Sequence, residues 1–272
     1  MMRYTELNSI LITGASSGIG RAVALYLAAP RVRLYLGGRN QNALMQVADE
    51  CIRRGAVVET KTLDVCDQQE MEEWVYSVGQ LDFVLASAGV SIGTTDQSAE
   101  HNLPESAYRV RQIMQTNIDG VLNTVLPAIE VMKQQNRNGE NIRGRIAAIA
   151  SVAGLVNSAW APSYCASKAA VDRFMVSSGG GLERLGIYLS SICCGFIRTP
   201  MTAKHKFVMP GLMSSDKAAK LIVQGVLDNK RRVIFPVWMI ILARVIDLLP
   251  VRLLERLYLP YLQKKIIKND KS

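Results

Sequence analysis

The sequence predicts an α/β fold, a doubly wound parallel sheet of about seven strands followed by an amphipathic helical extension. Three observations support this. Short apolar runs alternate with helix-length amphipathic segments over residues 1–235. Several of these runs are apolar at successive positions, which is typical of strands covered on both faces. The chain has 272 residues, 49% of them hydrophobic, which suits one large domain with a substantial core.

The strands and helices can be assigned in order along the chain. The strands are expected at residues 9–13, 33–37, 57–63, 81–86, 145–150, 187–194 and 231–235. The segments between them carry apolar residues at helical spacing, and the helices are expected near 18–29, 41–54, 67–79, 105–136, 161–184 and 214–228. Because strand and helix alternate, the strands should run parallel.

Three successive glycines, Gly179–Gly181, fall within the helix expected over 161–184. Each glycine costs roughly 1 kcal/mol relative to alanine in a helix. Two interpretations stay open. Either the helix is frayed or broken here, or the glycines permit a close approach of two helices at a subunit contact.

The turn after the first strand has the composition of a phosphate-binding site. The stretch "TGASSGIG" leads from that strand into the first expected helix. Backbone N–H groups of such a turn, together with the helix dipole, favour a bound pyrophosphate. Its glycines remove side chains where the chain turns tightly or lies against a ligand. The expected cofactor-binding residues are Gly14, Ser16, Ser17, Gly18, Ile19 and Gly20.

The end of the second strand indicates which dinucleotide, NAD or NADP(H), such a turn would be expected to bind. Folds that select NAD place an acidic residue here to hold the ribose hydroxyls. This chain has Gly38 followed by Arg39. A guanidinium pairs with a 2′-phosphate, so Arg39 favours NADP(H) over NAD. Ser16 is a second candidate for that phosphate.

Tyr164 and Lys168 are four residues apart in an expected helix and therefore share one face. An ammonium group beside a phenol favours the phenolate and lowers the tyrosine pKa from its usual value of about 10. An oxidised nicotinamide is also cationic and acts in the same direction. The pair predicts a tyrosine that exchanges a proton near neutral pH.

These motifs together resemble the short-chain dehydrogenase/reductase family, in the branch with Tyr-x-x-x-Lys and a Thr-Gly-x-x-x-Gly-x-Gly cofactor motif. The resemblance covers residues 7 to about 235 and implies a Rossmann-type fold. "SYCASKAAV" carries Tyr164 and Lys168, "IASVAG" supplies Ser151, and "TNIDG" supplies Asn117. By resemblance, Tyr164 protonates the carbonyl oxygen as hydride arrives at carbon, and Ser151 hydrogen-bonds that oxygen. Lys168 also binds the nicotinamide ribose, and Asn117 holds a water that relays protons to Lys168.

Two shorter matches imply further cofactor contacts. "LDV" corresponds to the Asp-Val pair that contacts adenine in the family and points to Asp64 and Val65. "ASAG" stands where the family has Asn-Asn-Ala-Gly. It supplies Ala88 and Gly89 but neither asparagine.

The segment "CCGFIRTP" resembles the Pro-Gly-x-x-x-Thr loop of the family, with Cys194 in place of the proline. Ile197 and Thr199 are expected to meet the nicotinamide carboxamide. Cys193 and Cys194 are either redox-sensitive thiols or buried thiols at a strand end, and the second interpretation is preferred.

The resemblance implies an NADP(H)-dependent carbonyl reductase or alcohol dehydrogenase that interconverts a carbonyl and a secondary alcohol. The apolar, methionine-rich loop over 200–213 suits a lipophilic small-molecule substrate. One alternative is a 3-oxoacyl-carrier-protein reductase, whose acidic carrier would dock on a basic tail. An alternative of another class is a non-catalytic dinucleotide sensor or scaffold. The family usually forms homodimers or homotetramers through the helices that hold Asn117 and Tyr164.

Charge and composition argue against other classes. The net charge is +9, but residues 230–272 hold ten Lys/Arg against three Asp/Glu, so the domain itself is nearly neutral. No nucleic-acid partner is expected. His101 and His205 stand alone and no CxxC occurs, so no metal site is expected. Five cysteines, an odd number, favour a reduced, cytoplasmic setting.

A boundary is expected at Pro236, dividing a catalytic NADP-binding domain, residues 1–235, from a basic amphipathic tail, residues 236–272. Residues 237–249 are apolar except for Arg244 and Asp247. A membrane span needs about 20 apolar residues and tolerates such charges poorly. Pro250 and Pro260 divide the rest into short helices. The tail is therefore predicted to be amphipathic rather than membrane-spanning.

Two interpretations of the tail stay open, and they are compatible. Its apolar stripes pack on the protein's own body or on a sister subunit and roof the active site. Alternatively, residues 237–268 lie peripherally on a membrane surface. In that case Trp238, Tyr258 and Tyr261 sit at the interface, and the lysines face anionic lipid. Those lysines are Lys264, Lys265, Lys268 and Lys271.

Overall fold

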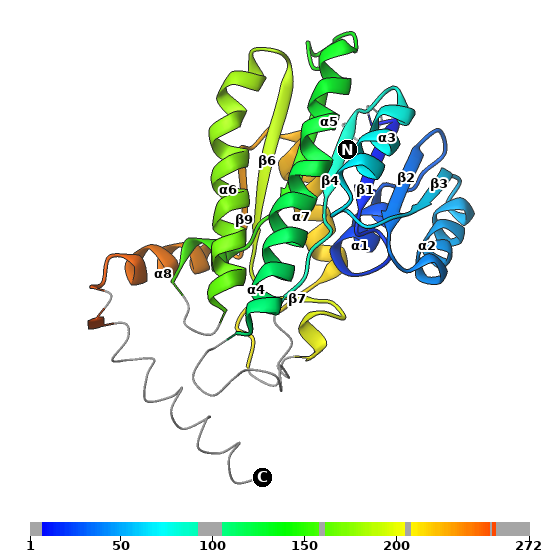
Figure 1. The fold of residues 1–272 in the computed structure, drawn as a ribbon. Helices are drawn as coiled ribbons and strands as arrows, with labels where there is room; N and C mark the ends of the chain where they lie inside the picture. The colour runs from blue at the N-terminus through cyan, green and yellow to red at the C-terminus, as the bar shows by residue number, and fades with distance from the viewer. Residues whose placement is uncertain (1–6, 92–104, 158–160, 205–207, 251, 254–272) are drawn as a thin grey trace.

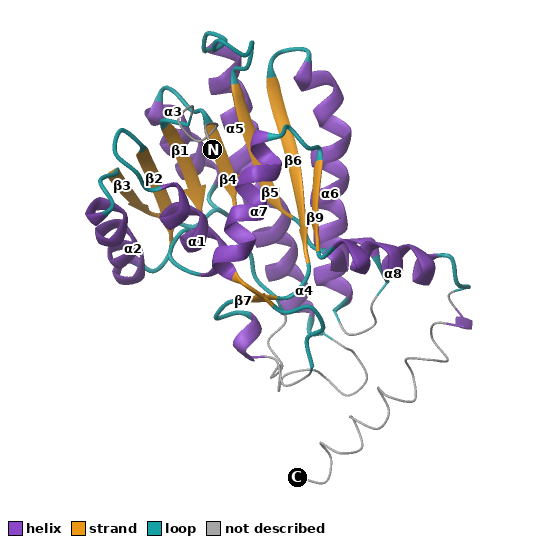
Figure 2. Ribbon diagram, turned by 180° about the vertical axis from the view of Figure 1, so that it is seen from behind, coloured by secondary structure: helices purple, strands orange, loops and turns teal. Residues whose placement is uncertain are grey.

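The structure is a computed structural model that describes residues 7–91, 105–157, 161–204, 208–250 and 252–253 (Figure 1). Its centre is a seven-stranded parallel sheet in the order β3-β2-β1-β4-β5-β6-β9 (Figure 2). This order confirms the predicted doubly wound, Rossmann-type sheet. The strands are β1 Ser9–Thr13, β2 Arg33–Gly38, β3 Val57–Thr62, β4 Phe83–Ala86, β5 Gly144–Ile149, β6 Ile187–Cys194 and β9 Arg232–Phe235.

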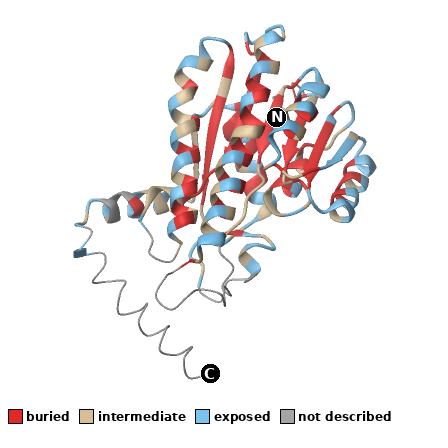
Figure 3. Ribbon diagram, viewed as in Figure 1, coloured by how far each residue is buried: buried red, intermediate tan, exposed pale blue. Residues whose placement is uncertain are grey.

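Helices cover both faces of the sheet, which explains why the central strands are apolar at successive positions (Figures 2 and 3). One core lies between the sheet and α1, α2 and α7, and the other lies between the sheet and α3, α5 and α6. The bounds are α1 Gly18–Leu27, α2 Gln41–Arg53, α3 Gln68–Val78, α5 Gly120–Gln134, α6 Pro162–Glu183 and α7 Ser215–Leu227.

The long helix expected over 105–136 has three parts. α4, Ala107–Met114, continues into a π-helical turn, η2, Gln115–Asp119, and then into α5. Such turns occur often at functional sites. Here the turn contains the candidate residue Asn117.

The three glycines do not interrupt α6, which continues to Glu183. The interpretation of a frayed or broken helix is therefore wrong. Arg231 lies against this stretch, since its Nη1 would be 3.5 Å from a Cβ built on Gly180. Arg231 also pairs with Glu183 at 2.5 Å. The proposed subunit contact at these glycines stays a prediction.

Several short elements were not expected from the sequence. A two-stranded sheet joins β7, Ile197–Arg198, to β8, Met213–Ser214. The 3-10 helices η3, Val152–Leu155, and η4, Thr202–Lys204, follow β5 and β7. All of them lie in the connections after the carboxyl ends of β5 and β6, where the sequence pattern is irregular.

The last described helix, α8, spans Val237–Asp247 and extends sideways from the end of β9 (Figures 1 and 2). It packs against η3 and β9. Across the described ranges, no helix is both long and apolar enough to cross a bilayer. The remainder of the expected tail, from residue 254 on, lies outside the described residues.

Candidate active site

A cavity of about 330 Å³ opens at the carboxyl edge of the sheet. This is the edge at which open α/β sheets bind their ligands. Tyr164 and Lys168 line it together with the glycine-rich turn. It brings together nearly all the expected cofactor residues, namely Gly14, Ser16, Ser17, Gly18, Ile19, Arg39, Asp64, Val65, Ala88, Gly89, Ile197 and Thr199.

At two positions of the turn only glycine fits, because a side chain would clash with neighbouring backbone atoms. Gly14 has φ +65°, and a Cβ there would lie 2.7 Å from the backbone of Ala88. A Cβ on Gly20 would collide with the carbonyl oxygen of Gly14. Gly20 does not line the cavity, so it serves the packing of α1 on the turn. The turn is thereby held against the loop after β4, and both line the cavity.

The loop after β4 lacks the two asparagines of the resembled motif, and other residues support it. The Oγ1 of Thr13 accepts a hydrogen bond from the N–H of Ser87 at 3.2 Å. Asn117 Oδ1 accepts from the N–H of Val90 at 2.8 Å, and its Nδ2 donates to the Val90 carbonyl at 3.0 Å. A second bond from Nδ2 reaches Ser167 Oγ at 3.0 Å. Asn117 therefore fixes this loop to the helix that carries the Tyr/Lys pair.

Helix α6 positions Tyr164 and Lys168. At its start the Ser163 N–H donates to the buried carboxylate of Glu105 at 3.1 Å, a favourable charge at a helix N-terminus. Lys168 Nζ donates to the Ile149 carbonyl at 2.7 Å and lies 5.7 Å from the centroid of the Tyr164 ring. The ammonium and the phenol thus face the same cavity.

A buried ion pair anchors the same helix to the sheet further along. The carboxylate of Asp172 accepts two hydrogen bonds from Arg232 in β9, at 2.8 and 2.7 Å, and one from Ser191 Oγ at 2.7 Å. Burial would raise the pKa of the Asp172 carboxyl, but these hydrogen bonds outweigh it and lower the pKa. The anchor limits how far α6 can shift relative to the strands.

Ser151 lies two residues after the end of β5 and is the N-cap of η3. Its Oγ donates to the Cys194 carbonyl at 3.3 Å and accepts from the N–H of Ala153 at 3.1 Å. The Ser151 hydroxyl also acts on the phenol of Tyr164, whose pKa it lowers. The two catalytic candidates expected to share one substrate oxygen therefore influence each other electrostatically.

The electrostatics differ from the sequence expectation. Part of Tyr164 is accessible through the cavity, yet the surrounding protein removes water from its phenol and raises its pKa. The hydrogen bond from Ser151 lowers this pKa by less than burial raises it. The expected lowering by Lys168 is therefore wrong for the protein alone. Burial also lowers the pKa of Lys168 to about 8, so both groups tend toward their neutral forms.

Arg39 stands at the end of β2 as predicted, with 60% of its side chain exposed. It faces Asp64, with Nη1 3.6 Å from Oδ2. Exposed ion pairs of this kind contribute little to stability, so Arg39 can exchange this partner for a phosphate at small cost. The residues present fit a dinucleotide phosphate here. Arg39, Ser16 and the glycines of the turn all line this cavity, and they offer a guanidinium, a hydroxyl and backbone N–H groups as donors.

The two adjacent cysteines are buried thiols rather than reactive ones. Burial raises the pKa of Cys193 to about 12 and that of Cys194 to about 11. Because the thiolate is the reactive form, neither is prepared for redox chemistry. The turn after Cys194 is held by a hydrogen bond from the Gly195 N–H to the Phe235 carbonyl at 2.9 Å. Strand pairing therefore supports the turn where the family has proline.

Some lining residues were missed by sequence reasoning. They share one property, which is that they directly follow the carboxyl ends of strands or lie in the loops after them. This position alone could have identified several. They include Asn40, Ser87, Val90, Cys194, Gly195, Pro200, Met201 and Thr202. Among the described residues, no cluster of His, Cys, Asp or Glu side chains could hold a metal ion.

The sheet order, the glycine-rich turn and the Tyr/Lys pair at one cavity define a dinucleotide-binding α/β oxidoreductase. Known proteins identify the family. The family described as short chain dehydrogenase matches residues 8–207. An uncharacterized oxidoreductase of Myxococcus xanthus is 34% identical over 92% of this chain and 95% of its own length. The chain therefore belongs to the short-chain dehydrogenase family and is an oxidoreductase of that family.

Other similar proteins carry more specific names. A fatty acyl-CoA reductase of Acinetobacter baylyi is 30% identical over 82% of this chain and 74% of its own length. The crystal structure of a variant actinorhodin polyketide ketoreductase with NADPH matches with a TM-score of 0.71. It is 23% identical and covers 84% of this chain and 95% of its own. At that identity the match shows the fold, and a neighbour of similar likeness holds NAD instead.

Proposed function

We propose that this protein is an NADP(H)-dependent oxidoreductase that interconverts a carbonyl and a secondary alcohol on a hydrophobic substrate. The main support is that Tyr164 and Lys168 line the same cavity as the glycine-rich turn, with the Ser151 hydroxyl acting on the pKa of the tyrosine. When bound, the nicotinamide supplies or accepts the hydride. The side chains must then deliver one proton to the substrate oxygen in reduction and remove it in oxidation.

Tyr164 is the proton donor in this mechanism. Its raised pKa keeps the phenol protonated near neutral pH, which suits reduction. Ser151 donates a hydrogen bond to the same substrate oxygen and stabilises the charge that develops on it. Lys168, charged below its pKa of about 8, stabilises the phenolate left after the proton has moved. Asn117 hydrogen-bonds Val90 and Ser167, and so helps to hold the part of α6 that carries Lys168 in position.

The preference for NADP(H) over NAD is part of the proposal. It is supported by Arg39 at the end of β2, where a carboxylate would be needed for NAD, and by the Ser16 hydroxyl nearby. A guanidinium offers two parallel donors to a phosphate, while a carboxylate would repel it.

A lipophilic substrate is supported by the cavity wall and by one relative. Ile197 and Met201 line the cavity beyond the phosphate-binding turn, and the Acinetobacter relative is named for a fatty acyl-CoA. Reduction of a 3-oxoacyl group on a carrier is the second candidate, because a polyketide ketoreductase shares the fold.

In this proposal the protein works in the cytoplasm as a homodimer or homotetramer. Residues 1–235 are the catalytic domain, and residues 236–272 are an appendage through which the enzyme reaches its substrate at a membrane surface. The division rests on the sequence pattern, and the packing of α8 on η3, which Ser151 caps, supports a role for the start of the appendage near the site.

A turnover assay tests the function. The purified chain is given NADPH or NADH with a panel of long-chain ketones, small soluble ketones, a 3-oxoacyl thioester and a fatty acyl-CoA. We expect oxidation of NADPH with at least one ketone and a lower rate with NADH. Tight NADPH binding without turnover on any member would instead indicate a dinucleotide sensor. A rate confined to the 3-oxoacyl thioester would favour the second candidate.

A further inference from the structure

Helix α8 presents an apolar face to solvent. We define the docking face as Val237, Trp238, Ile241, Leu242 and Val245 of α8, with Val208 and Leu212 of the neighbouring loop. Each of these side chains is between 38% and 89% exposed. A surface helix normally places polar residues on its outer side, so an outer side of this composition indicates a partner.

The opposite side of α8 is occupied by the protein. Ala243 is buried, and Met239 and Ile240 are partly buried against the body of the enzyme. The Met239 sulfur reaches Gly195, a residue of the cavity wall, with 2.6 Å between Sδ and a Cβ built on that glycine. Since the inner side is packed, the helix cannot rotate to hide its outer residues.

The docking face continues to the mouth of the catalytic cavity. The Trp238 ring packs on Gly211, 3.2 Å from a Cβ built there, which joins α8 to the loop that carries Val208 and Leu212. Met201, 39% exposed, lies before that loop and lines the cavity. The apolar surface and the cavity therefore share the carboxyl edge of the sheet.

The charge of the chain decides between two possible occupants of this face. After Pro250 the sequence has six Lys/Arg and two Asp/Glu. A second copy docked symmetrically would bring two such basic segments together, and they would repel each other. An anionic lipid surface accepts both the apolar side chains and the basic segment. A tryptophan such as Trp238 is favoured at the boundary between acyl chains and headgroups.

We infer that the docking face seats the enzyme on an anionic lipid bilayer with its cavity mouth toward the membrane. A lipophilic substrate would then pass from the acyl region to the cavity without crossing bulk water. This inference rests on the proposed function for the identity of the substrate, but binding to lipid can be measured without turnover.

The test uses the full chain and flotation with two kinds of vesicle, pure phosphatidylcholine and phosphatidylcholine with about 30% phosphatidylserine. We expect binding to the mixed vesicles that weakens with salt. Ile241→Glu should reduce it by about tenfold or more, because an apolar anchor is replaced by a charge that anionic lipid repels. The matched control is Ile52→Glu, on α2 at the opposite end of the sheet. Ile52 is 52% exposed against 63% for Ile241.

Three results would overturn the inference: no binding to either vesicle type, an equal loss for Ile52→Glu, or unchanged lipid binding by Ile241→Glu with dissociation of a dimer in light scattering. The last would assign the face to a second copy. Reduction of a soluble ketone by NADPH is measured on the same samples and should be retained in both variants. Turnover without lipid binding would refute only the membrane-docking inference. Lipid binding without any turnover would refute only the proposed function.

Discussion

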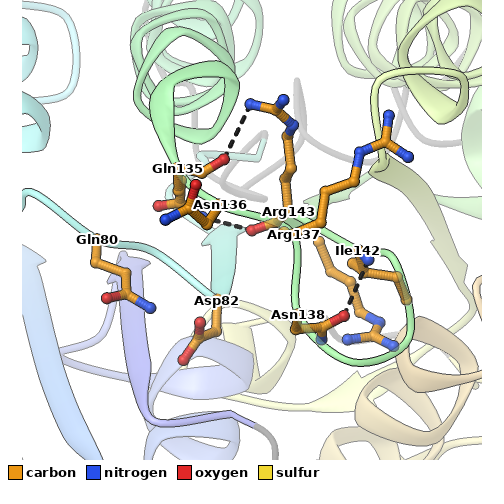
Figure 4. Close-up of a pocket in the computed structure, with 10 residues that line it drawn as sticks. Gln80, Asp82, Gln135, Asn136, Arg137, Asn138, Ile142 and Arg143 are labelled. Carbon is orange, nitrogen blue, oxygen red and sulfur yellow. Dashed lines mark hydrogen bonds between the residues drawn. The ribbon is translucent and has the colours of Figure 1, made fainter.

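At the carboxyl edge of the sheet, a cavity of about 330 Å³ is lined by the backbone of a glycine-rich turn and by Tyr164 and Lys168. A cavity of about the same volume lies at the amino edge and is lined by arginine, asparagine and glutamine side chains (Figure 4). Equal size therefore says little about function here. The difference lies in what the polar groups of each cavity already bind.

At the amino edge the polar groups mainly bind the protein. The Arg143 guanidinium donates to the carbonyl of Gln135 at 2.9 Å (Figure 4). It also donates to the carbonyl of Lys133, and together the two bonds satisfy carbonyl groups at the end of α5. Asn138 Oδ1 accepts from the N–H of Ile142 at 2.9 Å. Arg145 donates to Asn229 at 2.9 Å. These contacts close loops and helix ends, so this edge is expected to stabilise the fold.

At the carboxyl edge the polar groups are directed into the cavity or held near it at a cost. Lys168 is only 4% exposed, and burial lowers its pKa to about 8. A buried cationic side chain that donates to a neutral backbone carbonyl, that of Ile149, contributes little to stability. Such arrangements are typical of catalytic sites. Substitutions at the carboxyl edge should therefore mainly reduce activity, and substitutions at the amino edge should mainly reduce stability.

The largest effect is expected from Tyr164→Phe. It removes the proton that the substrate oxygen must receive, while the ring that fills the site is retained. NADPH-dependent ketone reduction should fall by about a hundredfold to ten-thousandfold. NADPH binding, measured by fluorescence titration, should change little.

Tyr108→Phe is the matched control, because Tyr108 is 76% exposed on α4 and does not line the cavity. It should leave the rate unchanged. A Tyr164→Phe enzyme that keeps most of its turnover would show that another group delivers the proton, and the proposed mechanism would be wrong.

The next effect in size concerns Arg39. Arg39→Ala should raise KM for NADPH by about tenfold to a hundredfold, since hydrogen bonds to a charged group contribute about 1.5–3 kcal/mol. KM for NADH should change much less. Arg33→Ala is the control, because Arg33 lies at the amino end of the same strand, is 55% exposed and faces Glu59 at 4.0 Å. An equal rise of KM for both cofactors would show that Arg39 does not recognise the 2′-phosphate.

The sequence predicted the sheet, its strand positions and most of the cavity wall, because local patterns carry that information. Alternating apolar segments determine a doubly wound sheet, and its carboxyl edge then follows from chain direction. Tyr164 and Lys168 share a face by spacing alone. These features depend on residues near one another in the chain.

What the sequence could not predict depends on contacts between distant residues. The pKa of Tyr164 is set by how much protein surrounds its phenol, which spacing on one helix does not reveal. The two hydrogen bonds between Asn117 and Val90 join residues 27 positions apart. The continuity of α6 through Gly179–Gly181 also depends on tertiary packing, which overrides propensity.

The pH dependence of reduction tests the buried lysine. Below about pH 8 Lys168 carries its charge and Tyr164 is protonated, so both are in the required form. As pH rises through about 8 the lysine loses its charge while the tyrosine stays protonated. The value of kcat/KM for reduction should fall by about tenfold per pH unit above that point. A reduction profile that stays flat well above pH 8 would show that the charge on Lys168 is not used.

The smallest effect on catalysis, and the sharpest test of the contrast between the edges, comes from Arg143→Ala. The change leaves the carbonyls of Lys133 and Gln135 without this donor, so the free energy of unfolding should fall by about 1–3 kcal/mol. Urea unfolding measures this loss. The values of kcat and of KM for NADPH should stay at those of the parent at a temperature where both are folded.

Lys168→Met provides the converse at the carboxyl edge. It removes a buried charge together with its hydrogen bond to Ile149, and these two changes act on stability in opposite directions. Activity should collapse while the urea midpoint moves less than in Arg143→Ala. If Arg143→Ala instead reduced kcat with the unfolding free energy intact, the amino edge would be coupled to the chemistry. The arginines of that edge would then belong to a functional site, and their role would not be limited to hydrogen-bonding the carbonyls at the end of α5.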